Sequence, residues 1–101
     1  MSRRRQDRES EELEAMIRRM QRALVRRARS GDTTALEALA RLERSGSAAT
    51  TVALAAAHTS GGGFYSYGEL AQTMRTSRQA VMQRIGRQDQ APAELRSWLL
   101  G

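Results

Sequence analysis

Cysteine and lysine are absent from this 101-residue chain, and proline, histidine and tryptophan occur once each. Without cysteine the chain can form neither disulfides nor thiolate metal sites. The lone His58 lacks a second histidine for a metal site or a nucleophile–base pair, and it reads simply as a helix C-terminal residue. No apolar run is long enough for a signal peptide or a membrane span. These absences argue against an enzyme, a metal or cofactor site and a membrane protein, and they predict a cytoplasmic location.

The charge of the chain is strongly basic. The formal net charge is +6, the isoelectric point is about 11.3, and all 17 basic residues are arginine. Residues 1–30 carry ten arginines against five acids and residues 64–101 carry five against three, whereas residues 31–63 carry two against three. GC-rich codon usage explains most of the missing lysine, but arginine still provides bidentate geometry toward guanine and phosphate. The balance favours a polyanionic partner, most often nucleic acid.

The periodicity of apolar residues predicts an all-α fold, a helical bundle of about six helices forming a single domain over residues 10–101. Residues 1–9 have no apolar residue after the first methionine, so a disordered basic arm is expected there. Its arginines at positions 3–5 either reach DNA or only aid solubility.

A long amphipathic helix is expected over residues 10–30, with Ser10 as its cap and Gly31 as its end. Glutamates in its first turn and arginines in its last turn complement the helix dipole. Two heptads are too few for a stable free coiled coil, so its apolar stripe must pack on the domain or on a second copy, and we favour a homodimer. The stripe consists of Leu13, Ile17, Met20 and Leu24, and it is broadened by Met16, Val25 and Ala28.

Residues 34–63 predict two supporting helices and a glycine-rich loop. Thr34 and Glu37 fit a capping box for a helix that ends at residues 45–47, and a small apolar helix follows to about Ala57. The TSGGG segment after it lacks the Gly-Lys-Ser/Thr and the preceding strand of a phosphate loop, which predicts a flexible connector. The aromatic side chains expected to fill the gap before the next helices are Phe64, Tyr65 and Tyr67.

Residues 64–87 carry the most informative pattern, two short helices joined by a tight turn. Ser66 and Glu69 fit a capping box for the first helix, and the second begins with a Thr76–Gln79 box or with Ser77 alone. The small Ala71 allows the two helices to cross closely, as in a helix-turn-helix unit. The residues expected to face the core are Leu70, Met74, Val81 and Ile85.

The segment ELAQTMRTSRQAVMQRIGR resembles the helix-turn-helix domains of small regulators from high-GC bacteria and their phages, in which an alanine-containing helix precedes a Ser-Arg-Gln-Ala-Val opening of the recognition helix. The likeness is strong over about 20 residues and reaches about 40 with the preceding alanine-rich helix. Such domains usually have glycine in the turn; Arg75 must therefore avoid the left-handed conformation or accept about 1 kcal/mol of strain. The resemblance implies a transcriptional regulator that binds double-stranded DNA sequence-specifically as a dimer, with the second helix in the major groove.

The predicted DNA-binding surface consists of long donors and acceptors on the second helix and its turn. Arg78 would contact guanine, and Gln79 or Gln83 would contact adenine. Ser77, at the helix N-terminus, and three flanking arginines would hold phosphates. The predicted set is Arg75, Thr76, Ser77, Arg78, Gln79, Met82, Gln83, Arg84 and Arg87.

Residues 92–100 predict a short final helix that begins at Pro92, with Trp98 as a core or dimer anchor. Three alternatives stay open: a DNA-binding accessory subunit of phage packaging or recombination, a protein-interaction module that docks through residues 10–30, and a plain helical bundle. No pattern indicates a cofactor or a small-molecule ligand.

Overall fold

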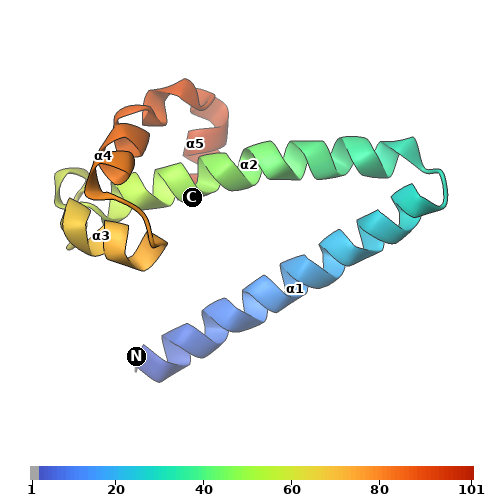
Figure 1. Ribbon diagram of the computed structural model, residues 1–101, viewed down its shortest axis with the longest axis horizontal. Helices are drawn as coiled ribbons and strands as arrows, with labels where there is room; N and C mark the ends of the chain where they lie inside the picture. Colours follow the sequence, from blue (N-terminus) through green and yellow to red (C-terminus); the bar gives the residue numbers. More distant parts are fainter. Residues whose placement is uncertain (1–2) are drawn as a thin grey trace. The chain divides into compact units, whose positions relative to one another are not determined.

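The computed structural model describes residues 3–101, in which the regular elements are helical (Figure 1). The α-helices are α1 (Arg3–Arg29), α2 (Thr33–Ala57), α3 (Tyr67–Met74), α4 (Arg78–Gly86) and α5 (Ala93–Leu100), with 3-10 turns at Thr59–Gly61 and Gln88–Gln90. The all-α prediction is confirmed, but residues 3–101 form five α-helices and not about six. The chain divides into two compact units, one ending at Glu43 and the other running from Arg44 to Gly101.

The first helix begins at Arg3 and not at Ser10, so the expected disordered arm is wrong for residues 3–9. Residues 1 and 2 lie outside the described part of the chain. A helix that already exists is extended by one hydrogen bond for each residue fixed, which needs no apolar contact. The Arg5 guanidinium also lies 3.3 Å from the Glu9 carboxylate one turn later.

The second correction concerns α2, which runs through Ser45-Gly46-Ser47 without a break. A glycine inside a helix costs only about 1 kcal/mol relative to alanine, which the hydrogen bonds on either side outweigh. Within this stretch the Thr50 hydroxyl donates to the Gly46 carbonyl at 3.0 Å and the Thr51 hydroxyl donates to the Ser47 carbonyl at 3.2 Å. The two predicted helices are therefore a single helix.

The turn between α1 and α2 is closed by local hydrogen bonds. Gly31 has a φ of 100° and ends α1 as predicted, and the Asp32 backbone N–H donates to the Arg27 carbonyl at 3.0 Å. The Asp32 carboxylate accepts from the Thr34 backbone N–H at 3.0 Å and also from the Thr34 hydroxyl. Asp32, rather than the predicted Thr34–Glu37 box, caps α2.

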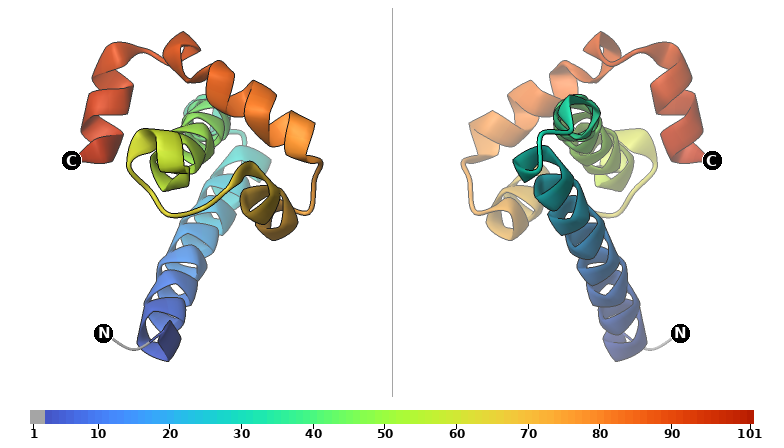
Figure 2. Two further views of the ribbon diagram at one scale, coloured as in Figure 1. Left: turned by 90° about the vertical axis from the view of Figure 1, so that its left-hand side faces the viewer. Right: turned by 90° about the vertical axis from the view of Figure 1, so that its right-hand side faces the viewer.

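The core of residues 44–101 forms where α3 and α4 pack on the C-terminal end of α2 (Figure 2). Val81 is the most deeply buried side chain of this core, at 1% exposed. The prediction for Met74 is wrong, because its side chain is 38% exposed. The residues of the core are Leu54, Ala55, Leu70, Ala71, Val81 and Ile85.

The glycine-rich segment after α2 is fitted closely against the end of that helix, unlike the flexible connector that its composition predicted. A Cβ atom at Gly61 or at Gly63 would collide with backbone atoms of α2. Gly62 has a φ of 90°, which suits glycine. The Tyr65 backbone N–H donates to the Ala57 carbonyl at 3.1 Å, which closes the turn.

The aromatic residues are less buried than the sequence predicted. Phe64 is 88% exposed and Tyr65 is 51% exposed, and of the three only Tyr67 is half-buried against the core. Trp98 is 77% exposed, so it is not a core anchor.

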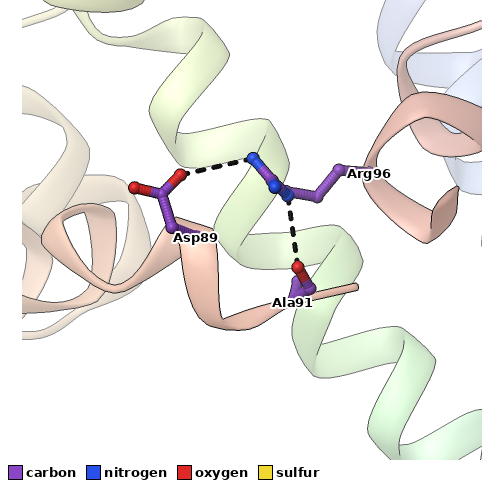
Figure 3. A network of polar contacts seen from close by, with 3 residues as sticks. All are labelled: Asp89, Ala91 and Arg96. Carbon is purple, nitrogen blue, oxygen red and sulfur yellow. Dashed lines mark hydrogen bonds and ion pairs between the residues drawn. The ribbon is translucent and has the colours of Figure 1, made fainter. Parts of the chain in front are cut away.

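The C-terminal helix α5 is joined to the preceding turn by Arg96 (Figure 3). The Arg96 Nε atom donates to the Ala91 carbonyl at 3.2 Å, and its Nη1 atom lies 3.3 Å from the Asp89 carboxylate. This arginine fixes the position of α5 relative to residues 88–91 and is not available as a free cation.

Candidate nucleic-acid interface

The turn between α3 and α4 is built on a left-handed Arg75. This residue has φ and ψ of 55° and 47°, and its backbone N–H donates to the Gln72 carbonyl at 3.2 Å. The Thr76 backbone N–H donates to the Ala71 carbonyl at 3.0 Å. Of the two options open to Arg75, the chain therefore takes the strained one, which costs about 1 to 2 kcal/mol for a residue with a Cβ atom. In return, only three residues separate the end of α3 from the start of α4.

Both predicted helix caps are present. The Ser66 hydroxyl accepts from the Glu69 backbone N–H at 3.2 Å, and the Glu69 carboxylate accepts from the Ser66 backbone N–H at 3.1 Å. At the start of α4 the Ser77 hydroxyl accepts from the Ala80 backbone N–H at 3.0 Å. Ser77 alone, rather than a Thr76–Gln79 box, is thus the second cap. The Ser77 hydroxyl thus occupies the Ala80 N–H, whereas the backbone N–H groups of Arg78 and Gln79 point out of the helix end.

α4 presents a buried face and an exposed face. Val81 and Ile85, four residues apart, lie in the core as predicted. On the other side, Gln79, Met82 and Gln83 are exposed, with Met82 at 44%. Their spacing of three and four residues places these side chains together along one face of the helix.

The two ends of α4 carry exposed arginines. Arg75 and Arg78 lie at the turn and the first residue of α4, together with the exposed Thr76 and Ser77, and Arg87 follows the last residue of α4. Within residues 3–101, Arg75, Arg78 and Arg87 form no ion pair with a carboxylate. Their positive charges are therefore available to an anionic ligand.

Arg84 is only partly exposed, whereas the sequence predicted an exposed side chain; its contact with phosphate stays a prediction. Its Nε donates to the Thr51 hydroxyl at 2.8 Å, and its Nη2 donates to the Ser47 carbonyl at 3.0 Å. These bonds join α4 to α2, in which Ser47 and Thr51 lie one turn apart. Both partners are neutral groups, and they hold the Arg84 side chain against α2.

His58 has a structural role that its place in the sequence did not indicate. Its ring is 7% exposed and stacks on Tyr67 with centroids 3.8 Å apart and planes at 17°. Its Nδ1 atom accepts from the Ser60 backbone N–H at 3.2 Å and lies 2.7 Å from the Ser60 hydroxyl. His58 thus joins the end of α2 to the first residue of α3, which a pattern of spacing could not reveal.

A shallow hollow lies beside α4. The hollow measures about 180 Å³ and is open to solvent. In the described part of the chain, no three His, Cys, Asp or Glu side chains gather as a metal site would require. The residues that line the hollow are Leu54, Met74, Thr76, Ala80, Val81 and Arg84.

No protein-family model, no curated protein and no solved structure matches this chain. Assignment of a function therefore depends on the residues and contacts of the α3–α4 pair itself.

Proposed function

We propose that this chain is a sequence-specific, double-stranded DNA-binding protein in which α3 and α4 form a helix-turn-helix and α4 enters the major groove. The observation that carries the proposal is the exposed face of α4, bounded at both ends by arginines that have no carboxylate partner among residues 3–101. Phosphates attract such charges without regard to sequence, and long side chains between them can read base edges.

The roles of individual residues follow from their places on the helix. Arg78 would donate both guanidinium branches to guanine, and Gln79 or Gln83 would pair with adenine. Arg75 and Arg87 would hold phosphates on either side, and Met82 would contact a thymine methyl group. Arg84 would act mainly as a positioning residue, because its hydrogen bonds to Ser47 and Thr51 fix α4 on α2.

The biological role that fits such a protein best is a cytoplasmic transcriptional regulator acting as a homodimer. Two copies of one recognition helix read two half-sites related by a two-fold axis, which multiplies specificity. A second candidate, a protein-interaction module, is favoured by one observation, the exposed apolar residues of α1. In that case the chain would have little affinity for DNA.

The test begins with selection of bound sequences from a random pool of duplex DNA, followed by gel-shift titration of the selected site. Arg78→Ala should weaken specific binding by about 1 to 3 kcal/mol and relax the preference at one base pair. The matched control is Arg41→Ala, which removes the same charge from an exposed position on α2. Equal losses in the two variants would remove Arg78 from base recognition, and failure to enrich any sequence would reject the proposal.

A further inference from the structure

The apolar stripe of α1 is exposed. Leu13 is 61% exposed, Ile17 is 56% exposed and Met20 is 60% exposed, while Leu24 is half-buried. Their spacing of four, three and four residues is that of a coiled-coil seam. Ala15, which lies between them in sequence, points to the opposite side of the helix. One narrow side of α1 therefore carries apolar surface that a partner helix would cover.

After residues 3–8, which carry four arginines and one aspartate, the charges of α1 are divided along its length. Residues 9–14 carry four glutamates and no basic residue, whereas residues 18–29 carry six arginines and no acid. A second α1 in parallel register would set acids beside acids and arginines beside arginines. In antiparallel register each acidic segment would lie beside the basic segment of the other helix, and opposite charges attract at that distance.

We infer that the stripe is covered by α1 of a second copy of this chain, running antiparallel. In the register that centres the stripe on itself, Leu13 lies opposite Leu24 of the second copy and Ile17 lies opposite Met20. This inference rests on the homodimer in the proposed function and names its interface, but it does not depend on contact with DNA. Leu36 near the start of α2, 55% exposed, offers further apolar surface in the same unit.

The first experiment measures the oligomeric state of the full chain by sedimentation equilibrium. The wild-type chain should be a dimer, and Ile17→Glu should raise its dissociation constant at least about tenfold, because each dimer then buries two unpaired carboxylates. Ala15→Glu adds the same charge to the opposite face of α1 and should leave the dimer unchanged. A monomeric wild-type chain, or equal effects of the two variants, would overturn the inference. Far-UV circular dichroism confirms that both variants remain helical.

The second experiment determines the direction of the helices by disulfide formation. The natural chain has no cysteine, so each introduced thiol is unique. Ser10→Cys and Arg27→Cys occupy positions that face each other only in the antiparallel register, within the short Cα separation that a disulfide needs. A mixture of the two variants should give the mixed disulfide, and Ser10→Cys alone should not cross-link. Cross-linking of Ser10→Cys with itself would indicate parallel helices and overturn the inference.

Salt and DNA separate this inference from the proposed function. Added sodium chloride should weaken the dimer, since it screens attraction between the acidic and basic segments, whereas a parallel pair would be strengthened. If the dimer cross-links as expected but no duplex is enriched in the selection, the proposed function is rejected and the antiparallel interface is still supported. If the chain is a monomer and still binds the selected duplex, the antiparallel interface is rejected and DNA binding is still supported.

Discussion

The two units of this chain bury their apolar side chains to very different extents. In residues 44–101, Leu54, Leu70 and Val81 are at most 7% exposed and come from three different helices. In the described residues up to Glu43, Ala35 is the only buried side chain, and the large apolar residues of α1 other than Leu24 are about half exposed or more. The first arrangement is a small core, and the second is a pair of helical segments without one.

The comparison shows which forces hold each unit. Residues 44–101 gain stability from apolar surface removed from water, together with specific contacts such as those of Arg84 and His58. Residues up to Glu43 depend on helical hydrogen bonds and exposed ion pairs such as Arg18–Glu14, which contribute little. A long helix with such sparse support is stable mainly when a partner covers its apolar face.

Matched isoleucine substitutions should give the largest difference between the two units in the free energy of unfolding. Ile85→Ala removes a core side chain that is 6% exposed and should lower the free energy of unfolding by about 2 to 5 kcal/mol. Ile17→Ala, at a position 56% exposed, should change it by less than about 0.5 kcal/mol where the chain is monomeric. Urea unfolding followed by far-UV circular dichroism at low protein concentration measures both. Similar losses would mean that Ile17 packs within its own chain.

Glycine-to-alanine substitutions compare a closely packed backbone position with an open one. Gly63→Ala should lower the free energy of unfolding by about 2 to 3 kcal/mol, because the added Cβ would meet the carbonyls of Ala56 and Ala57. Gly46→Ala, in open space on α2, should raise it by up to about 1 kcal/mol. Thermal unfolding of the two variants provides the comparison. A stable Gly63→Ala protein would show that the segment after α2 is looser than its contacts indicate.

The strain at Arg75 predicts a smaller effect of opposite sign. Arg75→Gly should raise the free energy of unfolding by up to about 1 kcal/mol, since glycine adopts the left-handed conformation without a Cβ clash. Arg75→Ala loses the same guanidinium but keeps the Cβ atom, so it isolates the strain from the charge. Chemical denaturation of the three proteins gives the ranking, with glycine the most stable. If alanine and glycine are equally stable, the turn is not strained.

The smallest expected effect is the loss of helicity in acid when the Asp32 cap at the start of α2 is protonated. Hydrogen bonds from the Thr34 side chain, and to a smaller extent from its backbone N–H, hold the pKa of Asp32 below its ordinary value. A lowered pKa in the folded chain means that this stabilisation is complete above the ordinary value of about 3.9 and is lost as pH falls below it. Asp32→Asn cannot ionise and should show a smaller loss of helicity between about pH 5 and about pH 2.5. Circular dichroism of both proteins measures the difference, and identical curves would contradict the assignment.

Local signals explain which expectations held. The Ser66–Glu69 box, the Ser77 cap and the end of α1 at Gly31 involve residues within a few positions of one another, so sequence alone predicted them. The continuity of α2 was missed because Ser45-Gly46-Ser47 reads as a breaker, while its neighbours and Arg84 keep it helical. The placement of Arg84 joins residues 33 and 37 positions apart, and no local pattern encodes such a contact.

The sequence by itself determined the helical class, the caps of α3 and α4, and the division of α4 into an apolar and a polar side, because these depend on backbone hydrogen bonds and on the 3.6-residue period of a helix. Only the tertiary structure decided that Arg84 serves α2, that His58 stacks on Tyr67, and that Trp98 and the α1 stripe stay exposed. Those outcomes depend on which surfaces meet when the chain folds. Packing between segments distant in sequence selects among faces that look equally apolar along the chain.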